Sequence, residues 1–213
     1  MRNRFDRQLV KLNESLIQMG MLVEEAIAGA VGLVVEGNME NAEKVIADNE
    51  EIKDKEREIE RLCMKMLLQQ QPVASDLRKI SSALKMITDL ERMGNQAADI
   101  CEISVKMYVT KNYIPPQIKE MASEVIYMVN SAVEAYVKND CDLAVEVIEY
   151  DNKVDALFNS TKAELVQRIS DNAEGSDESI DILMIAKYLE KIGDHAVNTA
   201  DWVVFSIKGI HVD

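Results

Sequence analysis

Apolar residues recur three or four positions apart along almost the entire chain. The longest stripe begins at Leu12 and continues through Leu16, Met19 and Val23 as far as Val34. Such spacing places the apolar side chains on one face of an α-helix. The pattern predicts six long helices, over residues 5–36, 39–71, 75–110, 117–138, 141–170 and 178–207.

Breaks in this pattern separate the predicted helices. The first helix ends near Gly37, and the second stops before Pro72. Ser75 is suited to cap the third helix, because its hydroxyl can accept a hydrogen bond from a free backbone N–H. Residues 112–116 end in two prolines and form the clearest linker, and residues 171–177 form a polar loop.

The second half of the sequence repeats the plan of the first half. Val35–Asn38 aligns with Val137–Asp140, and the apolar positions that follow also match. A helical hairpin cannot bury its own apolar stripe, whereas three antiparallel helices can. The sequence therefore predicts an all-α fold of two tandem, pseudo-symmetric three-helix bundles, residues 1–111 and 116–213, placed end to end or side by side.

Two similar segments, residues 90–102 and 189–201, carry the most distinctive repeat. Each segment places three acids and one amide at the same four offsets. Because each helical residue advances by roughly 100°, the four side chains lie within an arc of roughly 80°, opposite the apolar face. We call these sets the first ridge, Glu91, Asn95, Asp99 and Glu102, and the second ridge, Glu190, Asp194, Asn198 and Asp201.

The ridges are candidate cation sites. Acids four residues apart repel each other by a few tenths of a kcal/mol, and no lysine lies within either stripe. Hard cations take several oxygen ligands, so a second helix has to complete each site. In the second half Asp151 and Asp155 are placed to do so, whereas Asn49 and Lys53 stand at the matching positions of the first half. The second half thus predicts the more complete site; a solvated polar face is the alternative.

Glycine and histidine positions refine this picture. Gly94 and Gly193 each cost about 1 kcal/mol in mid-helix, which indicates close helix approach beside the ridge, with simple packing as the alternative. Neither His195 nor His211 belongs to a Glu-x-x-His pair, which disfavours a ferritin-like di-iron site. We interpret His195, beside the second ridge, as a surface or interhelix histidine.

Charge and missing motifs exclude several functional classes. The net charge of −14 disfavours nucleic-acid binding and docking on an anionic membrane, and suits a cation or a basic partner. No signal peptide and no apolar run of membrane-spanning length is evident, and the three cysteines form no CxxC, as expected of a cytoplasmic protein. The motifs GxxxxGK[ST], GxSxG and HExxH are all missing.

Three segments give the sequence a resemblance to a known family. Residues 70–78 (QQPVASDLR), 89–95 (DLERMGN) and 189–194 (LEKIGD) resemble motifs of the PhoU family, and the similarity covers essentially the whole chain. The resemblance implies two three-helix bundles that carry multinuclear iron or zinc clusters on E/DxxxD motifs. The implied ligands are Asp151, Asp155, Glu190, Asp194 and Asp201 with Asn198 nearby in the second half, and Glu91, Asp99 and Glu102 in the first half, where Asn95 replaces the usual Asp.

The same resemblance implies a function. PhoU proteins are regulators attached to the bacterial high-affinity phosphate transporter. A member is expected to repress phosphate uptake and the phosphate-starvation response without chemical turnover. Its expected partners are the transporter's ATPase subunit, a sensor histidine kinase and a second copy of itself. The residues alone leave two alternatives, a carboxylate-bridged multinuclear metal enzyme and a metal-free helical scaffold.

Overall fold

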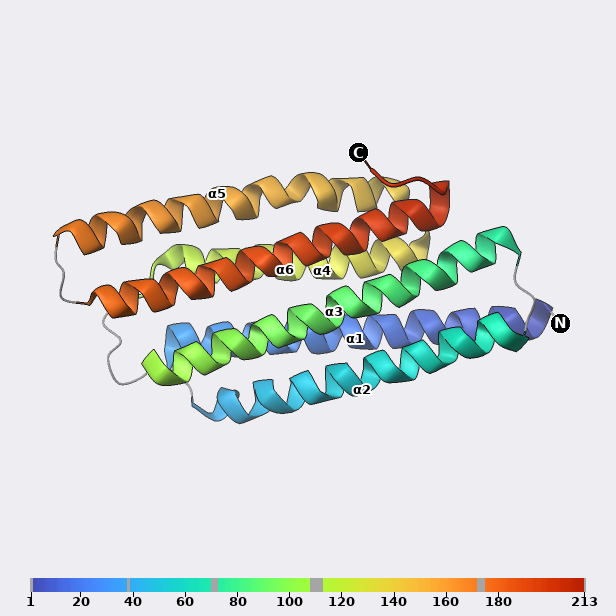
Figure 1. Ribbon diagram of the computed structural model, residues 1–213, viewed down its shortest axis with the longest axis horizontal. Helices are drawn as coiled ribbons and strands as arrows, with labels where there is room; N and C mark the ends of the chain where they lie inside the picture. The colour runs from blue at the N-terminus through green and yellow to red at the C-terminus, as the bar shows by residue number, and fades with distance from the viewer. Residues whose placement is uncertain (1, 38, 70–72, 108–112, 172–174, 213) are drawn as a thin grey trace.

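The chain folds into long antiparallel helices (Figure 1). The computed structural model describes residues 2–37, 39–69, 73–107, 113–171 and 175–212. The helices are α1 (Arg2–Glu36), α2 (Glu40–Gln69), α3 (Ala74–Met107), α4 (Pro116–Lys138), α5 (Cys141–Asp171) and α6 (Ser176–Lys208). The described residues contain no strand, and the predicted all-α fold of six long helices is confirmed.

The two groups of three helices lie side by side (Figure 1). α3 packs against α6 and α1 against α4, so these four helices form the seam between the halves. α2 packs on α1 and α3, whereas α5 packs on α4 and α6. Each half therefore places one helix, α2 or α5, at the outside of the molecule.

Local hydrogen bonds explain most of the described helix ends. Asn139 ends α4 in the left-handed conformation (φ 54°), and Asp140 Oδ1 then accepts a hydrogen bond from Leu143 N–H at 3.0 Å, at the start of α5. The prediction that Ser75 caps α3 is wrong, because α3 begins at Ala74. The predicted ends at residues 71 and 110 and parts of both predicted loops lie outside the described residues.

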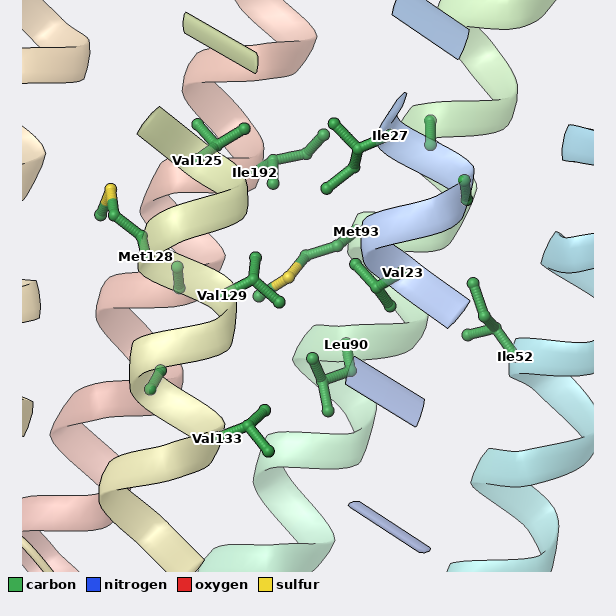
Figure 2. Close-up of a cluster of buried hydrophobic side chains, with 14 of the residues drawn as sticks. Val23, Ile27, Ile52, Leu90, Met93, Val125, Met128, Val129, Val133 and Ile192 are labelled. Atoms are coloured by element: carbon green, nitrogen blue, oxygen red, sulfur yellow. The ribbon is translucent and has the colours of Figure 1, made fainter. Parts of the chain in front are cut away.

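Both halves contribute to one apolar core (Figure 2). Met93 of α3 lies near Val23 of α1 and Val129 of α4, and Ile192 of α6 belongs to the same cluster. All four side chains are fully buried. Burying a side chain of this kind contributes about 1.5–3 kcal/mol, so the stripes of α1, α3, α4 and α6 hold the halves together.

The helix α1 is apolar because it is a core helix. By length and composition, residues 5–36 could cross a membrane. Half of their most apolar window is buried, however, and Leu12, Leu16 and Val23 have no exposed surface. Packing against α2, α3 and α4 thus accounts for the composition of α1.

We predict that Leu90→Ala destabilises the protein strongly. Leu90 is fully buried in α3 beside the seam, so truncation leaves a cavity that costs about 2–5 kcal/mol of unfolding free energy. Denaturant titration measures the loss. The matched control is Leu68→Ala at a side chain that is 80% exposed, where a change within about 0.5 kcal/mol is expected. Equal losses at the two positions would contradict a shared core at Leu90.

Candidate metal site between α5 and α6

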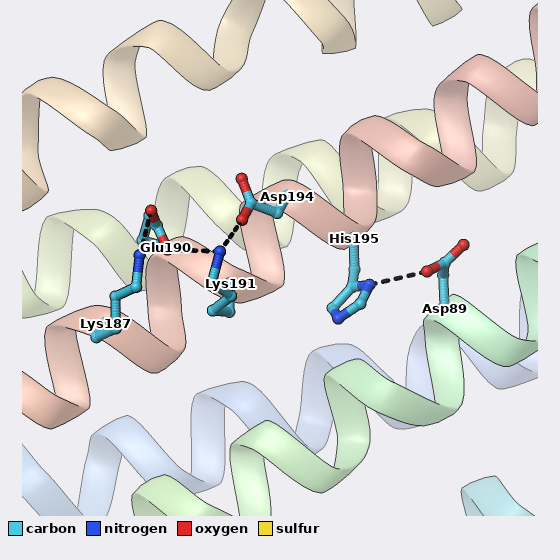
Figure 3. A network of polar contacts seen from close by, with 6 residues as sticks. All are labelled: Asp89, Lys187, Glu190, Lys191, Asp194 and His195. Carbon is cyan, nitrogen blue, oxygen red and sulfur yellow. Dashed lines mark hydrogen bonds and ion pairs between the residues drawn. The ribbon is translucent and has the colours of Figure 1, made fainter.

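The helices α5 and α6 approach each other closely beside Gly193. A Cβ atom on Gly193 would lie 2.8 Å from Oδ1 of Asp151, so no larger residue fits unless the carboxylate moves. Glu190 and Asp194, on either side of Gly193, point toward the same side of α6 (Figure 3). The close approach predicted from the mid-helix glycine is confirmed, and it brings Asp151 of α5 to the second ridge.

Four predicted acids influence one another at this point. Burial first, and then the charges of Asp155, Asp194 and Glu190, raise the pKa of Asp151 to about 6, against a smaller opposing effect of Lys191. Oδ1 of Asp151 and Oε2 of Glu190 are both buried without a hydrogen bond. The site therefore concentrates negative charge that the protein satisfies incompletely.

Two lysines partly neutralise the ridge (Figure 3). Lys187 Nζ lies 2.6 Å from Glu190 Oε1, while Lys191 contacts Asp194 and lies 3.5 Å from Glu190 Oε2. Sequence reasoning missed both lysines, although each lies three residues before the acid with which it pairs, and this i, i+3 spacing is the signal that could have revealed them. With the side chains so arranged, no three described His, Cys, Asp or Glu residues converge closely enough to hold a metal ion. The lysine side chains are 40% and 43% exposed, and Lys187 Nζ also lies 5.2 Å from the ring centroid of Phe158.

Asp201, the last member of the second ridge, lies apart from this cluster. Asn198 is exposed. Asp201 Oδ1 accepts a hydrogen bond from Val212 N–H at 2.8 Å, and its Oδ2 contacts Nδ1 of His211. Asp201 lies seven residues after Asp194, which is roughly 10 Å along the helix axis. The structure thus brings Asp151, Asp155, Glu190 and Asp194 together but leaves Asp201 at a distance.

In the first half, amides occupy the equivalent place. A Cβ on Gly94 would lie 3.0 Å from Asn49 Oδ1, so α2 and α3 also approach closely at a glycine. Asn49 Nδ2 donates to Asn95 Oδ1 at 3.2 Å, and Asn95 Nδ2 donates to Glu91 Oε1 at 2.8 Å. Lys53 pairs with a neighbouring glutamate on its own helix. A hydrogen-bonded chain of two amides and one carboxylate therefore links α2 to α3, where four acids gather between α5 and α6.

The other first-ridge acids do not join this chain of amides. Burial, and secondly the charge of Glu102, raises the pKa of half-buried Asp99. Glu102 itself is exposed and pairs with Lys106 at 2.8 Å. Sequence reasoning missed Glu56, whose pKa is raised by burial and then by the charge of Glu91. Its spacing of seven residues from Asn49, two helical turns on the same face, is the signal that could have revealed it.

His195 joins the two halves beside the second ridge (Figure 3). Its Nδ1 lies 2.8 Å from Oδ1 of Asp89, so the contact crosses from α6 to α3. The side chains are only 14% and 10% exposed. The interhelix interpretation of His195 is confirmed, and the contact fixes the α3–α6 seam next to the acidic cluster.

Comparison with known proteins agrees with this architecture. The PhoU domain matches twice, over residues 16–104 and 118–203. The chain belongs to the PhoU family. Each matched PhoU segment contains one ridge with a close-approach glycine beside it, so the duplicated domains carry different chemistry at the same place, with Asn49 in one and Asp151 in the other. The exact division at residues 111 and 116 stays a prediction.

Relatives and solved structures match over nearly the full length. A phosphate-specific transport system accessory protein PhoU homolog of Pseudomonas aeruginosa is 31% identical over 98% of this chain and 87% of the relative. One from Clostridium acetobutylicum is 32% identical over 100% and 98%. The crystal structure of PhoU from Pseudomonas aeruginosa superposes with a TM-score of 0.90 at 31% identity, covering 97% of this chain and 100% of that one. The phosphate transport system regulatory protein PhoU from Streptococcus pneumoniae gives 0.89 at 25% identity, covering 98% and 99%.

We predict that Asp151→Asn stabilises the metal-free protein in a pH-dependent way. The raised pKa of Asp151 means that the native state binds more protons than the unfolded state between about pH 4 and pH 6. This carboxyl therefore lowers stability as pH rises through that window. Removing the charge should raise the unfolding free energy by about 1–2 kcal/mol at pH 7, allowing for partial exposure, and by little at pH 4.

Denaturant titrations from pH 4 to pH 8, with a chelator present, measure this difference. The control is Glu149→Gln on exposed α5 surface, where little change is expected at either pH. An equal gain in unfolding free energy at pH 4 and pH 7, or a loss at pH 7, would show that the charge of Asp151 does not destabilise the native state.

Proposed function

We propose that this protein is a cytoplasmic, non-enzymatic negative regulator of phosphate uptake and of the phosphate-starvation response. The proposal rests on the double match of this chain to the PhoU domain. Relatives that match nearly its whole length are named phosphate-specific transport system accessory proteins. The Streptococcus pneumoniae structure is likewise titled a phosphate transport system regulatory protein. The proposed partners are the ATPase subunit of the phosphate transporter, a sensor histidine kinase and a second copy of this chain.

The fold supports regulation by contact. The shared core and the His195–Asp89 contact fix α3 and α6 relative to each other. Charged side chains on such rigid helices keep fixed positions, and fixed charges favour selective docking of a partner with the opposite pattern. The overall charge of −14 suits a basic partner surface.

We further propose that the second half holds iron or zinc between α5 and α6. The donors would be Asp151, Asp155, Glu190 and Asp194, after Lys187 and Lys191 swing away. Two buried carboxylate oxygens without hydrogen bonds and the raised pKa of Asp151 support this fit, because a cation offsets the excess negative charge. A bound ion would supply positive charge that ties α5 to α6.

The first half does not fit such a metal. Its helices are joined by the Asn49–Asn95–Glu91 hydrogen bonds, and an ammonium group, Lys53, stands where the second half has Asp155.

The lysine pairs of the second ridge favour one alternative, a metal-free scaffold in which Lys187 and Lys191 replace the cation permanently.

The metal proposal predicts an asymmetric loss of metal. Protein purified without a metal-binding tag is analysed for iron and zinc as wild type, as Glu190→Gln/Asp194→Asn and as Glu91→Gln/Asp99→Asn. The second-half variant should lose most of its metal, since two of four donors lose their charge, and the first-half variant should keep it. Equal losses would overturn the ranking of the two halves, and a metal-free wild type would favour the scaffold.

The regulatory proposal is tested in the protein's own host. Deleting the gene should make starvation genes active in high phosphate, and the wild-type chain should restore repression. Glu190→Gln/Asp194→Asn should restore it less well than the matched control Glu120→Gln/Glu149→Gln, which removes two charges at exposed positions of α4 and α5. Normal repression in the deletion strain, with no paralogue present, would refute the proposal.

A further inference from the structure

The residues that follow α6 fold back onto it. Gly209 reverses the chain in the left-handed conformation, with φ of 77°. The ring of His211 then stacks on Phe205 at 4.7 Å between centroids and 11° between planes. It meets Trp202 edge-on, also at 4.7 Å. We call residues 209–212 the post-α6 segment; its contacts cover the last turns of α6.

The post-α6 segment lies at the seam between the halves. Lys85 of α3 places its Nζ 5.9 Å from the ring centroid of Trp202, on which the segment rests. A Cβ on Gly209 would lie 3.6 Å from Cδ of Arg78, near the start of α3. The segment therefore packs where α6 of one half meets α3 of the other.

Asp201 is the polar anchor of this arrangement. One carboxylate oxygen accepts the Val212 N–H and the other contacts His211 Nδ1, so both oxygens are already engaged. Ligation of a metal by Asp201 would have to release these contacts. Asp201 also lies eight residues from Gly193, where α5 packs closely on α6, and this separation is roughly 12 Å along the helix.

In the first half, the last ridge residue likewise lies outside the cluster beside the glycine. Glu102 occupies the position that matches Asp201, and it is exposed and paired with Lys106 on its own helix. In neither half does the last ridge residue take part in the cluster beside the close-approach glycine.

We propose that Asp201 anchors the post-α6 segment and is not a metal ligand, although the family pattern implies that it is one. The second ridge is thus divided into two parts. Glu190 and Asp194 face Asp151 and Asp155, while Asp201 holds the post-α6 segment on the last turns of α6, next to α3. The part of this inference that concerns ligands rests on the metal site proposed above. The anchoring part does not.

The test compares Asp201→Asn, Asp194→Asn and His211→Ala, all purified without a metal-binding tag. Trp202 is the one tryptophan in the chain, so its fluorescence reports directly on the post-α6 segment. Asp201→Asn and His211→Ala should both shift the emission to longer wavelength and raise the acrylamide quenching constant, because the segment loosens. Asp194→Asn should leave the emission unchanged.

Iron and zinc content provides the second readout. Asp194→Asn should lose metal, while Asp201→Asn and His211→Ala should match wild type. Loss of metal in Asp201→Asn to the extent seen in Asp194→Asn would overturn the proposal, as would unchanged tryptophan emission in Asp201→Asn. If wild type itself holds no metal, the metal proposal fails, and the fluorescence comparison alone decides whether Asp201 is the anchor.

Discussion

The burial of the stripes of α1, α3, α4 and α6 against one another is the constraint on which the rest of the structure depends. Neither half completes its core alone, because Met93 and Ile192 belong to one cluster built from both halves. The seam fixes α3 and α6, and each then offers its free side to an outer helix. Glu91 and Asn95 of the first ridge lie at the contact of α3 with α2, and Glu190 and Asp194 of the second ridge lie at the contact of α6 with α5.

The α2–α3 contact and the α5–α6 contact share a geometry and differ in charge. At Gly94 and at Gly193 the inner helix carries no side chain, and side chains of the outer helix fill the space. At Gly94 the space is filled by Ile52 and by the neutral amide of Asn49, which donates to Asn95 through Nδ2 while its Oδ1 is buried without a hydrogen bond. At Gly193 Asp151 fills it as a carboxylate among other carboxylates, which is costly when charged. Under the proposed metal site, the acids Asp151, Asp155 and Asp194, which stand where the first half has Asn49, Lys53 and Asn95, would make the α5–α6 contact responsive to cations and leave the α2–α3 contact insensitive.

Much of this could be predicted from sequence because it depends on periodicity. The 3.6-residue repeat determined the helices, the internal duplication indicated two similar halves, and the i, i+4 spacing of Asp151 and Asp155 predicted their place opposite the second ridge. The side-by-side packing could not be predicted, since apolar stripes do not specify which partner covers them. The engagement of Asp201 by Val212 was also hidden, because it depends on the chain reversal at Gly209, which leaves no periodic signal. The Lys191–Asp194 pair was overlooked although its i, i+3 spacing is a helical signal.

Hydrogen–deuterium exchange with and without added zinc or iron tests the central asymmetry most directly. Amide exchange follows local opening, so an ion that ties α5 to α6 should slow exchange around Asp151 and residues 190–194. The same addition should leave the region around Asn49 and residues 91–95 unchanged, because hydrogen bonds already join α2 to α3 there. Equal slowing of exchange at the α2–α3 and α5–α6 contacts, or slowing confined to α2 and α3, would contradict the account.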